Sequence, residues 1–146
     1  MVLEILLWML VLAMIALVVP SMIRGSRRSK AVKIHANLLM QDRDTLTPAQ
    51  FATSYFPDNF DVAKSIHEFL ANCLIVDCSR IRPEDSLFDD LGLGQVDGLA
   101  PNHFAVDVVV EFQVDLQPIL NNNSPSVRDV INYVSVTTCN HRPAAG

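Results

Sequence analysis

The chain begins with an unbroken run of hydrophobic residues and then changes to a periodic pattern of hydrophobic and polar positions. Residues 5–19 are fifteen apolar residues in succession. A helix over residues 5–23 rises about 1.5 Å per residue and spans roughly 28 Å, close to the hydrocarbon core of a bilayer, about 30 Å. A core helix would carry polar positions every few residues, and a signal peptide would carry positive charge before the run. Neither feature is present, so the pattern predicts one uncleaved membrane helix within residues 1–23.

A basic cluster follows this run directly. Its five residues are Arg24, Arg27, Arg28, Lys30 and Lys33. Because basic flanks stay on the cytoplasmic side of a membrane helix, we expect the N-terminus outside and the rest of the chain in the cytoplasm. The cluster acts as a stop-transfer flank, and contact with anionic lipid headgroups is a second role open to it.

Residues 24–57 are predicted to form a basic juxtamembrane linker that ends in a short helix. The weak apolar pattern of residues 31–44 fits a helix that leaves the membrane or a segment on its surface, and the sequence leaves both open. Thr47 is a good capping residue, and proline suits the first position of a helix. A short helix is therefore predicted from Pro48 to about Tyr55.

Residues 58–136 have the helical periodicity of a small bundle. Asp61 is predicted to cap a helix whose apolar residues recur on one face. These residues are Val62, Ile66, Phe69, Leu70, Cys73 and Leu74. His67 flanks this face and is expected to be structural, because no second metal ligand lies at a matching spacing.

Two further helices are predicted after a long loop over residues 77–88. The first runs from Pro101 to Phe112. Its inner face is predicted to hold Ala105, Val108, Val109 and Phe112. The second is capped by Ser124 or Ser126. Its inner face is predicted to hold Val127, Val130, Ile131 and Val134.

The end of the chain completes this prediction. A single turn is expected at residues 118–120, and residues 137–146 have no period and are predicted to be a disordered tail. The sequence thus predicts an all-α fold, a small helical bundle preceded by one transmembrane helix.

Charge divides the chain at the same place as hydrophobicity. The net charge is −5. Residues 1–33 hold five basic residues and one acidic residue, which gives +4, and the remainder holds six basic and fifteen acidic residues, which gives −9. Phosphates would be repelled by this acidic part, so nucleic acid is not expected as a partner. The three cysteines lack metal-ligand spacing and are expected to be reduced thiols of a cytosolic domain.

One stretch connects the chain to a known family. Residues 86–97 read SLFDDLGLGQVD, and the predicted last helix reads SVRDVINYV. Over roughly residues 58–136 the chain resembles the acyl carrier proteins, which implies their small helical bundle. In that family an Asp-Ser-Leu motif carries the phosphopantetheine arm, and the matching positions here are Gly94, Gln95 and Val96. An amide cannot accept the phosphodiester, so the resemblance implies the fold without its cofactor, and the second helix starts later than in the family.

Acidic residues gather between Glu84 and Asp115, where eight of them occur without a basic residue. In carrier proteins the matching surface docks basic patches of partner enzymes. The partner-binding candidates are Asp89, Asp90, Asp97, Asp107, Glu111 and Asp115. An ordinary solvated face that keeps the domain soluble explains the same pattern, and both interpretations stay open. The loop carboxylates lack the spacing of a calcium loop, so no metal is predicted.

No arrangement of a nucleophile with a base, and no glycine-rich phosphate loop, occurs in the sequence, so an enzyme is not predicted. The favoured hypothesis is a membrane-anchored, carrier-like interaction module that holds a basic protein partner, such as an enzyme of acyl or lipid metabolism, near the bilayer. One alternative is a working acyl or peptidyl carrier modified at another serine such as Ser86. Another is a structural membrane protein that self-associates.

Overall fold

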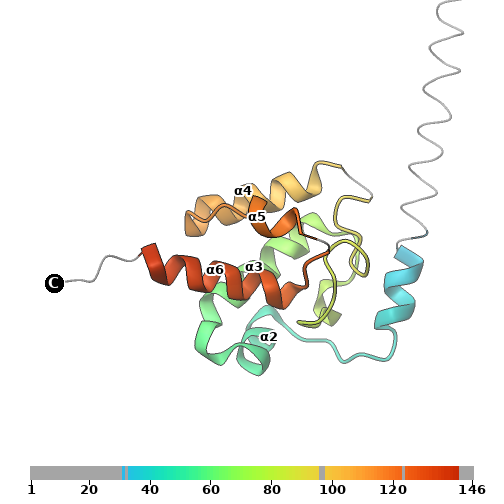
Figure 1. The fold of residues 1–146 in the computed structure, drawn as a ribbon. Coiled ribbons are helices and arrows are strands. Elements are labelled where there is room, and N and C mark those ends of the chain that lie inside the picture. Colours follow the sequence, from blue (N-terminus) through green and yellow to red (C-terminus); the bar gives the residue numbers. More distant parts are fainter. Residues whose placement is uncertain (1–30, 32, 96–97, 123, 142–146) are drawn as a thin grey trace, which may run out of the picture.

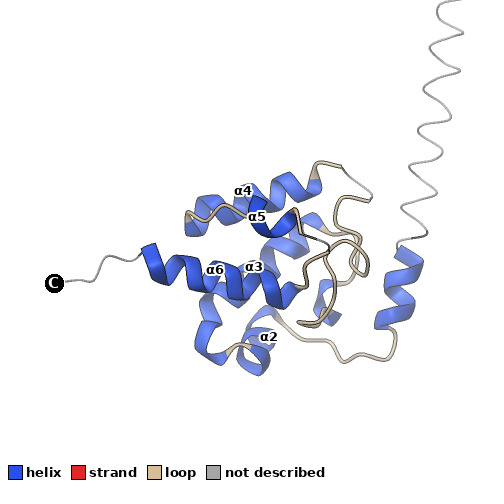
Figure 2. Cartoon of the chain, in the orientation of Figure 1, coloured by secondary structure: helices blue, strands red, loops and turns tan. Residues whose placement is uncertain are grey.

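The computed structural model describes residues 31, 33–95, 98–122 and 124–141 (Figure 1). The described residues form helices and loops without a β-strand, apart from an isolated bridge between Ser86 and Ser126 (Figure 2). The prediction of an all-α fold is therefore confirmed. Among the helices of these residues, none has the length and hydrophobicity to cross a membrane. The membrane helix predicted within residues 1–23 lies outside the described residues.

The helices follow one another in a simple order. A helical segment over residues 33–40 comes first. It is followed by α2 (Pro48–Tyr55), the 3₁₀ turn η1 (Pro57–Asn59), α3 (Phe60–Cys73), the 3₁₀ turn η2 (Cys78–Arg80), α4 (Ala100–Phe112), α5 (Gln117–Leu120) and α6 (Val127–His141). The helix α3 is central, because α2, α4 and α6 all pack against it (Figure 1).

Local sequence chemistry explains the start of two helices. The Thr47 hydroxyl accepts a hydrogen bond from the Gln50 amide nitrogen at 3.2 Å, and the Gln50 side chain accepts one from the Thr47 nitrogen at 2.9 Å. This reciprocal capping box satisfies two amide groups that the first turn of α2 leaves free. Ser126 and Asp129 make the same arrangement at the start of α6, with both bonds to backbone nitrogens within 3.2 Å. The predicted cap at Thr47 is confirmed, and of the two serines considered for the last helix, Ser126 makes the capping bonds.

Two predicted boundaries differ from the structure. Asp61 is not the cap of α3, because the 3₁₀ turn over residues 57–59 already leads the chain into the helix, which begins at Phe60 after Asn59. At the other end, α6 continues to His141, so residues 137–141 are helical and not part of a disordered tail. The hydroxyls of Thr137 and Thr138 bond to carbonyls one turn back, at 2.7 and 2.8 Å, which provides local polar contacts along this last turn.

The core joins all these elements. Its large side chains, all less than 2% exposed, include Phe51 of α2, Ile66 and Leu70 of α3, Phe104 and Val108 of α4, and Ile131 of α6. The helical segment 33–40 also belongs to it, since Ala36 and Met40 are 0% and 2% exposed. This segment, whose structure the sequence left open, is thus packed on the bundle.

Three arginines hold the chain after this segment, and we call them the arginine clamp: Arg43, Arg80 and Arg82. Arg43 donates to both carboxylate oxygens of Asp85, at 2.9 and 2.6 Å. Arg80 donates to the carbonyls of residues 40 and 41, and Arg82 to that of residue 44, at 2.9 to 3.2 Å. The clamp therefore fixes residues 40–44 to the loop that precedes the predicted motif.

Candidate functional site

Gln95 lies in a turn well before α4, at the position where the resemblance would place the modified serine. Its side chain is exposed, and its Nε2 donates to the carbonyl oxygen of Phe88 at 2.8 Å. The helix α4 begins only at Ala100, one residue before the predicted start at Pro101. The amide side chain thus cross-links its own loop by a hydrogen bond.

The loop before Gln95 is tight. Gly92 and Gly94 have φ angles of 68° and 82°, in the left-handed region that favours glycine. A Cβ at Gly94 would stand 2.8 Å from Cγ of Pro101, so a side chain at this position would also collide with the start of α4. The side chains of Leu91 and Leu93 are buried. Together with these glycines, they hold the loop close against the start of α4.

Ser86, the alternative attachment serine, is held inside this loop. Its hydroxyl accepts a hydrogen bond from the Asp89 nitrogen at 3.1 Å and forms a short hydrogen bond with the Ser124 hydroxyl. Its backbone nitrogen donates to the Asp90 carboxylate at 2.9 Å. The hydroxyl is half-buried and engaged, whereas a carrier requires an accessible attachment oxygen.

The acidic residues between Glu84 and Asp115 separate into two groups. The first group makes contacts within the fold. Asp85 is buried and pairs with Arg43, and Glu84 pairs with Arg128 at 2.7 Å. Asp90 accepts a hydrogen bond from the Ser86 nitrogen, and Asp115 accepts one from the Gln117 nitrogen at 2.9 Å. Asp89 makes a weak contact of 3.5 Å with the Ser86 hydroxyl. Asp97 lies outside the described residues.

The second group is on α4. In the described part of the chain, the carboxylates of Asp107 and Glu111 make no hydrogen bond and no ion pair. They lie one turn apart on the same helix, and Glu111 is exposed whereas Asp107 is half-buried. Of the predicted partner-binding carboxylates that the structure describes, it therefore brings two together on a helix face.

Beside these carboxylates α4 exposes hydrophobic side chains, which we call the α4 ridge: Leu99, at the start of the helix, with Val106, Val109 and Val110. Val106 and Val110 are 58% and 76% exposed. The prediction that Val109 faces the core is wrong, since it is 44% exposed. Phe104 is buried instead and packs in the core. The segment is hydrophobic on nearly all sides, so its period alone does not identify the inner face.

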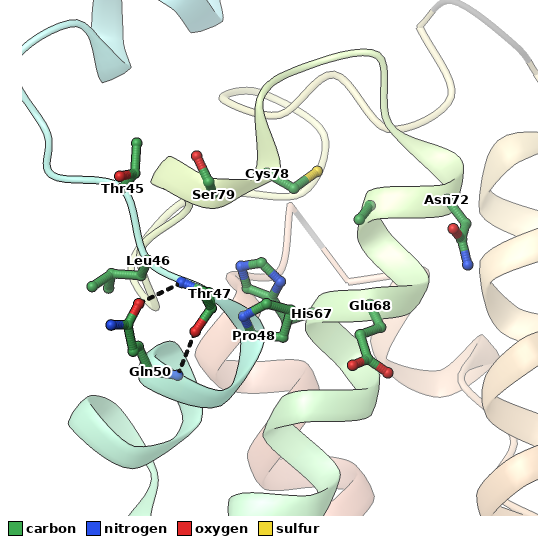
Figure 3. A pocket seen from close by; sticks show the side chains of 11 residues that line it. Thr45, Leu46, Thr47, Pro48, Gln50, His67, Glu68, Asn72, Cys78 and Ser79 are labelled. Carbon is green, nitrogen blue, oxygen red and sulfur yellow. Dashed lines mark hydrogen bonds between the residues drawn. The ribbon is translucent and has the colours of Figure 1, made fainter.

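A cleft lies on another side of α3, between this helix, the start of α2 and the turn η2 (Figure 3). His67 lines it and is 2% exposed, and neither of its ring nitrogens has a hydrogen-bond partner among the residues described. Burial lowers the pKa of His67 below the ordinary 6.5, and the nearby backbone of Cys78 and the Glu68 carboxylate only partly oppose this shift. His67 is buried in the fold, as is expected of a structural residue. Its ring nitrogens, however, make no hydrogen bond within the described part of the chain.

The two remaining predictions concern the basic cluster and metal binding. In the membrane flank, Lys33 is exposed, whereas Arg24, Arg27, Arg28 and Lys30 lie outside the described residues. Among the residues with described positions, no three His, Cys, Asp or Glu side chains gather in a way that would hold a metal ion.

Comparison with known proteins adds no relative to this chain. A scan against protein-family models, a search of curated proteins and a search of solved structures all found no match. Function must therefore be argued from the ridge, the carboxylates and the cleft themselves.

Proposed function

We propose that this protein is a membrane-anchored, acyl-carrier-like interaction module without a prosthetic arm, and that it docks a basic protein partner through α4. The observation that carries this proposal is the α4 ridge with its two free carboxylates, Asp107 and Glu111. Exposed hydrophobic side chains beside polar ones are the composition of a binding surface.

The chemistry of the surface selects the partner. Val106 and Val110 offer apolar area that a shallow groove on another protein can cover. The carboxylates at the edge have no cation beside them on α4, which contains no Lys or Arg. Complementary charge steers encounter and fixes orientation, so the fitting partner has an apolar groove bordered by Lys or Arg.

Two further features support a docking role over a carrier role. The helices α3, α4, α5 and α6, with a long loop after α3, follow the order that the resemblance to acyl carrier proteins implies. Gln95 occupies the attachment position and bonds to Phe88, and the hydroxyl of Ser86 is engaged within its loop. The module is therefore expected to present a surface and no reactive arm.

The arginine clamp supports the role of the membrane anchor. It ties residues 40–44 to the bundle, so the domain begins close behind the basic cluster. Holding a partner near the bilayer raises its effective concentration without any additional contact.

The test is capture of a partner from membranes that contain the full chain, by crosslinking through α4. A Cys139→Ser background is used, so that a photo-crosslinker on a cysteine introduced at Val106 reports on the ridge. We expect one heterologous product, reduced about tenfold by the Asp107→Asn, Glu111→Gln double variant and by 1 M salt, where the Debye length falls to about 3 Å. The matched control is Glu84→Gln, which removes an exposed carboxylate outside α4 and should leave capture unchanged.

Other outcomes would contradict the proposal. A partner whose capture ignores both salt and the double variant would not be held by α4 charge. A mass gain on Ser86 after co-expression with a phosphopantetheinyl transferase would establish a working carrier. Crosslinks between copies of this chain alone would establish a self-associating structural protein.

A further inference from the structure

The cleft beside His67 has the dimensions of a small-molecule site. It has a volume of about 580 Å³, within the range of about 300–1,000 Å³ that is typical of ligand pockets. Its apolar lining includes Leu46, Pro48, Ala71 and Cys78, and His67 lies among them (Figure 3). None of the residues that line it belongs to α4, so the cleft is separate from the proposed docking surface.

His67 is the feature of this cleft that the fold leaves unexplained. Its ring contacts that of Phe51 in a tilted arrangement, with the ring centroids 4.9 Å apart. Its two nitrogens are buried without a hydrogen bond in the described part of the chain. Leaving a buried donor or acceptor without a hydrogen bond is unfavourable, so a partner supplied from the cleft would stabilise the ring.

The state of the ring restricts this partner. Burial lowers the pKa of His67, so the ring is neutral near pH 7 and carries one donor and one acceptor. A hydroxyl group both donates and accepts, and it can therefore pair with either tautomer of the ring. A carboxylate has only acceptors when it is ionised.

The charge around the cleft restricts the rest of the ligand. Among the described residues that line it there is no Lys or Arg, and Glu68 contributes a carboxylate to its rim. The Glu68 carboxylate lies 4.0 Å from the Lys64 ammonium, which is outside the lining, so an anionic ligand would find no cation in the cleft itself to replace its hydration. The apolar lining favours a hydrophobic body, so the fitting molecule is uncharged, mainly apolar, and has a hydroxyl.

We propose that the cleft between α2 and α3 binds a neutral, largely apolar alcohol whose hydroxyl pairs with the imidazole of His67. The site binds and does not react. Burial raises the pKa of the neighbouring Cys78 thiol to about 12, which keeps it protonated, and the thiolate is the nucleophilic form.

The test uses the full chain in lipid nanodiscs and follows the imidazole NMR signals of His67. Benzyl alcohol is the probe, with toluene as the matched ligand without a hydroxyl and benzoate as the matched anion. We expect saturable shifts with benzyl alcohol, at concentrations about 3- to 10-fold lower than with toluene, the gain of one net hydrogen bond. Benzoate should give no saturable shift.

Two variants locate the effect. In His67→Phe the new ring can still pack on Phe51, but the two unpaired nitrogens are removed. Benzyl alcohol and toluene should then bind equally. The amide signals of residues 46 and 78 measure this binding. Ala71 is exposed on α3, so Ala71→Phe should fold normally while filling the cleft, and it should abolish saturation by both probes.

Three results would overturn the proposal: His67 signals that benzyl alcohol leaves unmoved, equal binding of benzyl alcohol and toluene to the unmodified chain, or saturation that survives Ala71→Phe. None of them bears on partner capture through α4, so this inference and the proposed function fail separately.

Discussion

The loop over residues 84–90 and the helix α4 are both acidic, but their carboxylates do different things. In the loop, Asp85 is buried against Arg43 and Glu84 is paired with Arg128. On α4, Asp107 and Glu111 have no such partner in the described part of the chain, and exposed valines lie beside them. The loop carboxylates stabilise the fold, whereas the helix carboxylates are available to another molecule.

The difference shows why acidic density alone does not identify a docking surface. A run of eight acidic residues appears uniform in the sequence, but the cations that neutralise the first of them, Arg43 and Arg128, lie about forty residues away along the chain, at separations of 42 and 44. What distinguishes the second group is that no cation pairs with it among the residues with described positions, and that exposed apolar area lies beside it.

The largest loss of stability is expected on replacing Asp85 in the loop. Asp85→Ala removes the acceptor of Arg43 and of the Arg82 nitrogen, which bonds to it at 2.8 Å. Because this leaves a part-buried guanidinium without its carboxylate and the Arg82 nitrogen without its acceptor, we expect the free energy of unfolding to fall by about 2 kcal/mol. Urea unfolding of the full chain, followed by circular dichroism, measures it. The control Glu111→Ala should change stability by less than about 0.5 kcal/mol, and an equal loss in both would contradict the division.

Charge reversal compares two exposed carboxylates directly. Glu111→Lys places a cation beside the α4 ridge, and we expect partner affinity to fall about tenfold, roughly 1.4 kcal/mol, because like charges would then meet at the rim. Glu84→Lys makes the same change of charge in the loop and should alter affinity less than twofold. Titration of the captured partner in membranes measures both. Similar losses would show that net charge, and not α4, governs binding.

Lowering the pH separates the contribution of His67 to stability from that of the carboxylates. The pKa of His67 is lower in the folded protein than its ordinary 6.5, so the unfolded chain takes up the proton first. Stability is therefore retained above pH 6.5 and decreases as the pH falls from there through the lowered folded value. His67→Phe should lose this part of the pH dependence in thermal unfolding between about pH 7 and 5.5. A variant that keeps the same slope would assign it to other groups.

The smallest effect is expected at Glu84. The hydrogen bond from Arg128 lowers the pKa of Glu84 below its ordinary 4.5, so this pair stabilises the fold above pH 4.5 and loses its contribution as the pH falls through the lowered folded value. The pair is largely solvent-exposed and screened, so Glu84→Gln should cost about 0.5 kcal/mol or less at neutral pH. Thermal unfolding at two pH values measures this, and the difference from the unmodified chain should vanish in acid.

The sequence predicts those parts of this structure that depend on neighbours in the chain. The cap at Thr47, and the cap at Ser126 as one of the two serines considered, need only residues three positions away, and the structure has both. The start of α3 was misplaced, because the preceding 3₁₀ turn at Pro57 competes with Asp61 for the role of helix start. The prediction that Val109 lies on the inner face of α4 is wrong. Apolar residues occur on several sides of this helix, so the hydrophobic period does not identify one inner face.

The functional features depend on contacts that a single sequence does not display. The pairing of Arg43 with Asp85 joins residues 42 positions apart. The unpaired state of His67 follows from the arrangement of α2, η2 and α3 around it. Of these features the sequence identifies only the two carboxylates of α4, as members of a larger set of acidic candidates, and it does not show which of them lack a cation or have exposed hydrophobic neighbours.

The arginine clamp limits how far the proposed module can reach. Since the helical segment 33–40 already packs on the bundle, only the chain between residues 24 and 32 separates the predicted membrane helix from the folded domain. Nine residues extend at most about 30 Å. In the proposed arrangement a partner would meet α4 within a thin layer along the bilayer, so proteins that already reside at the lipid surface would have the advantage over freely diffusing ones.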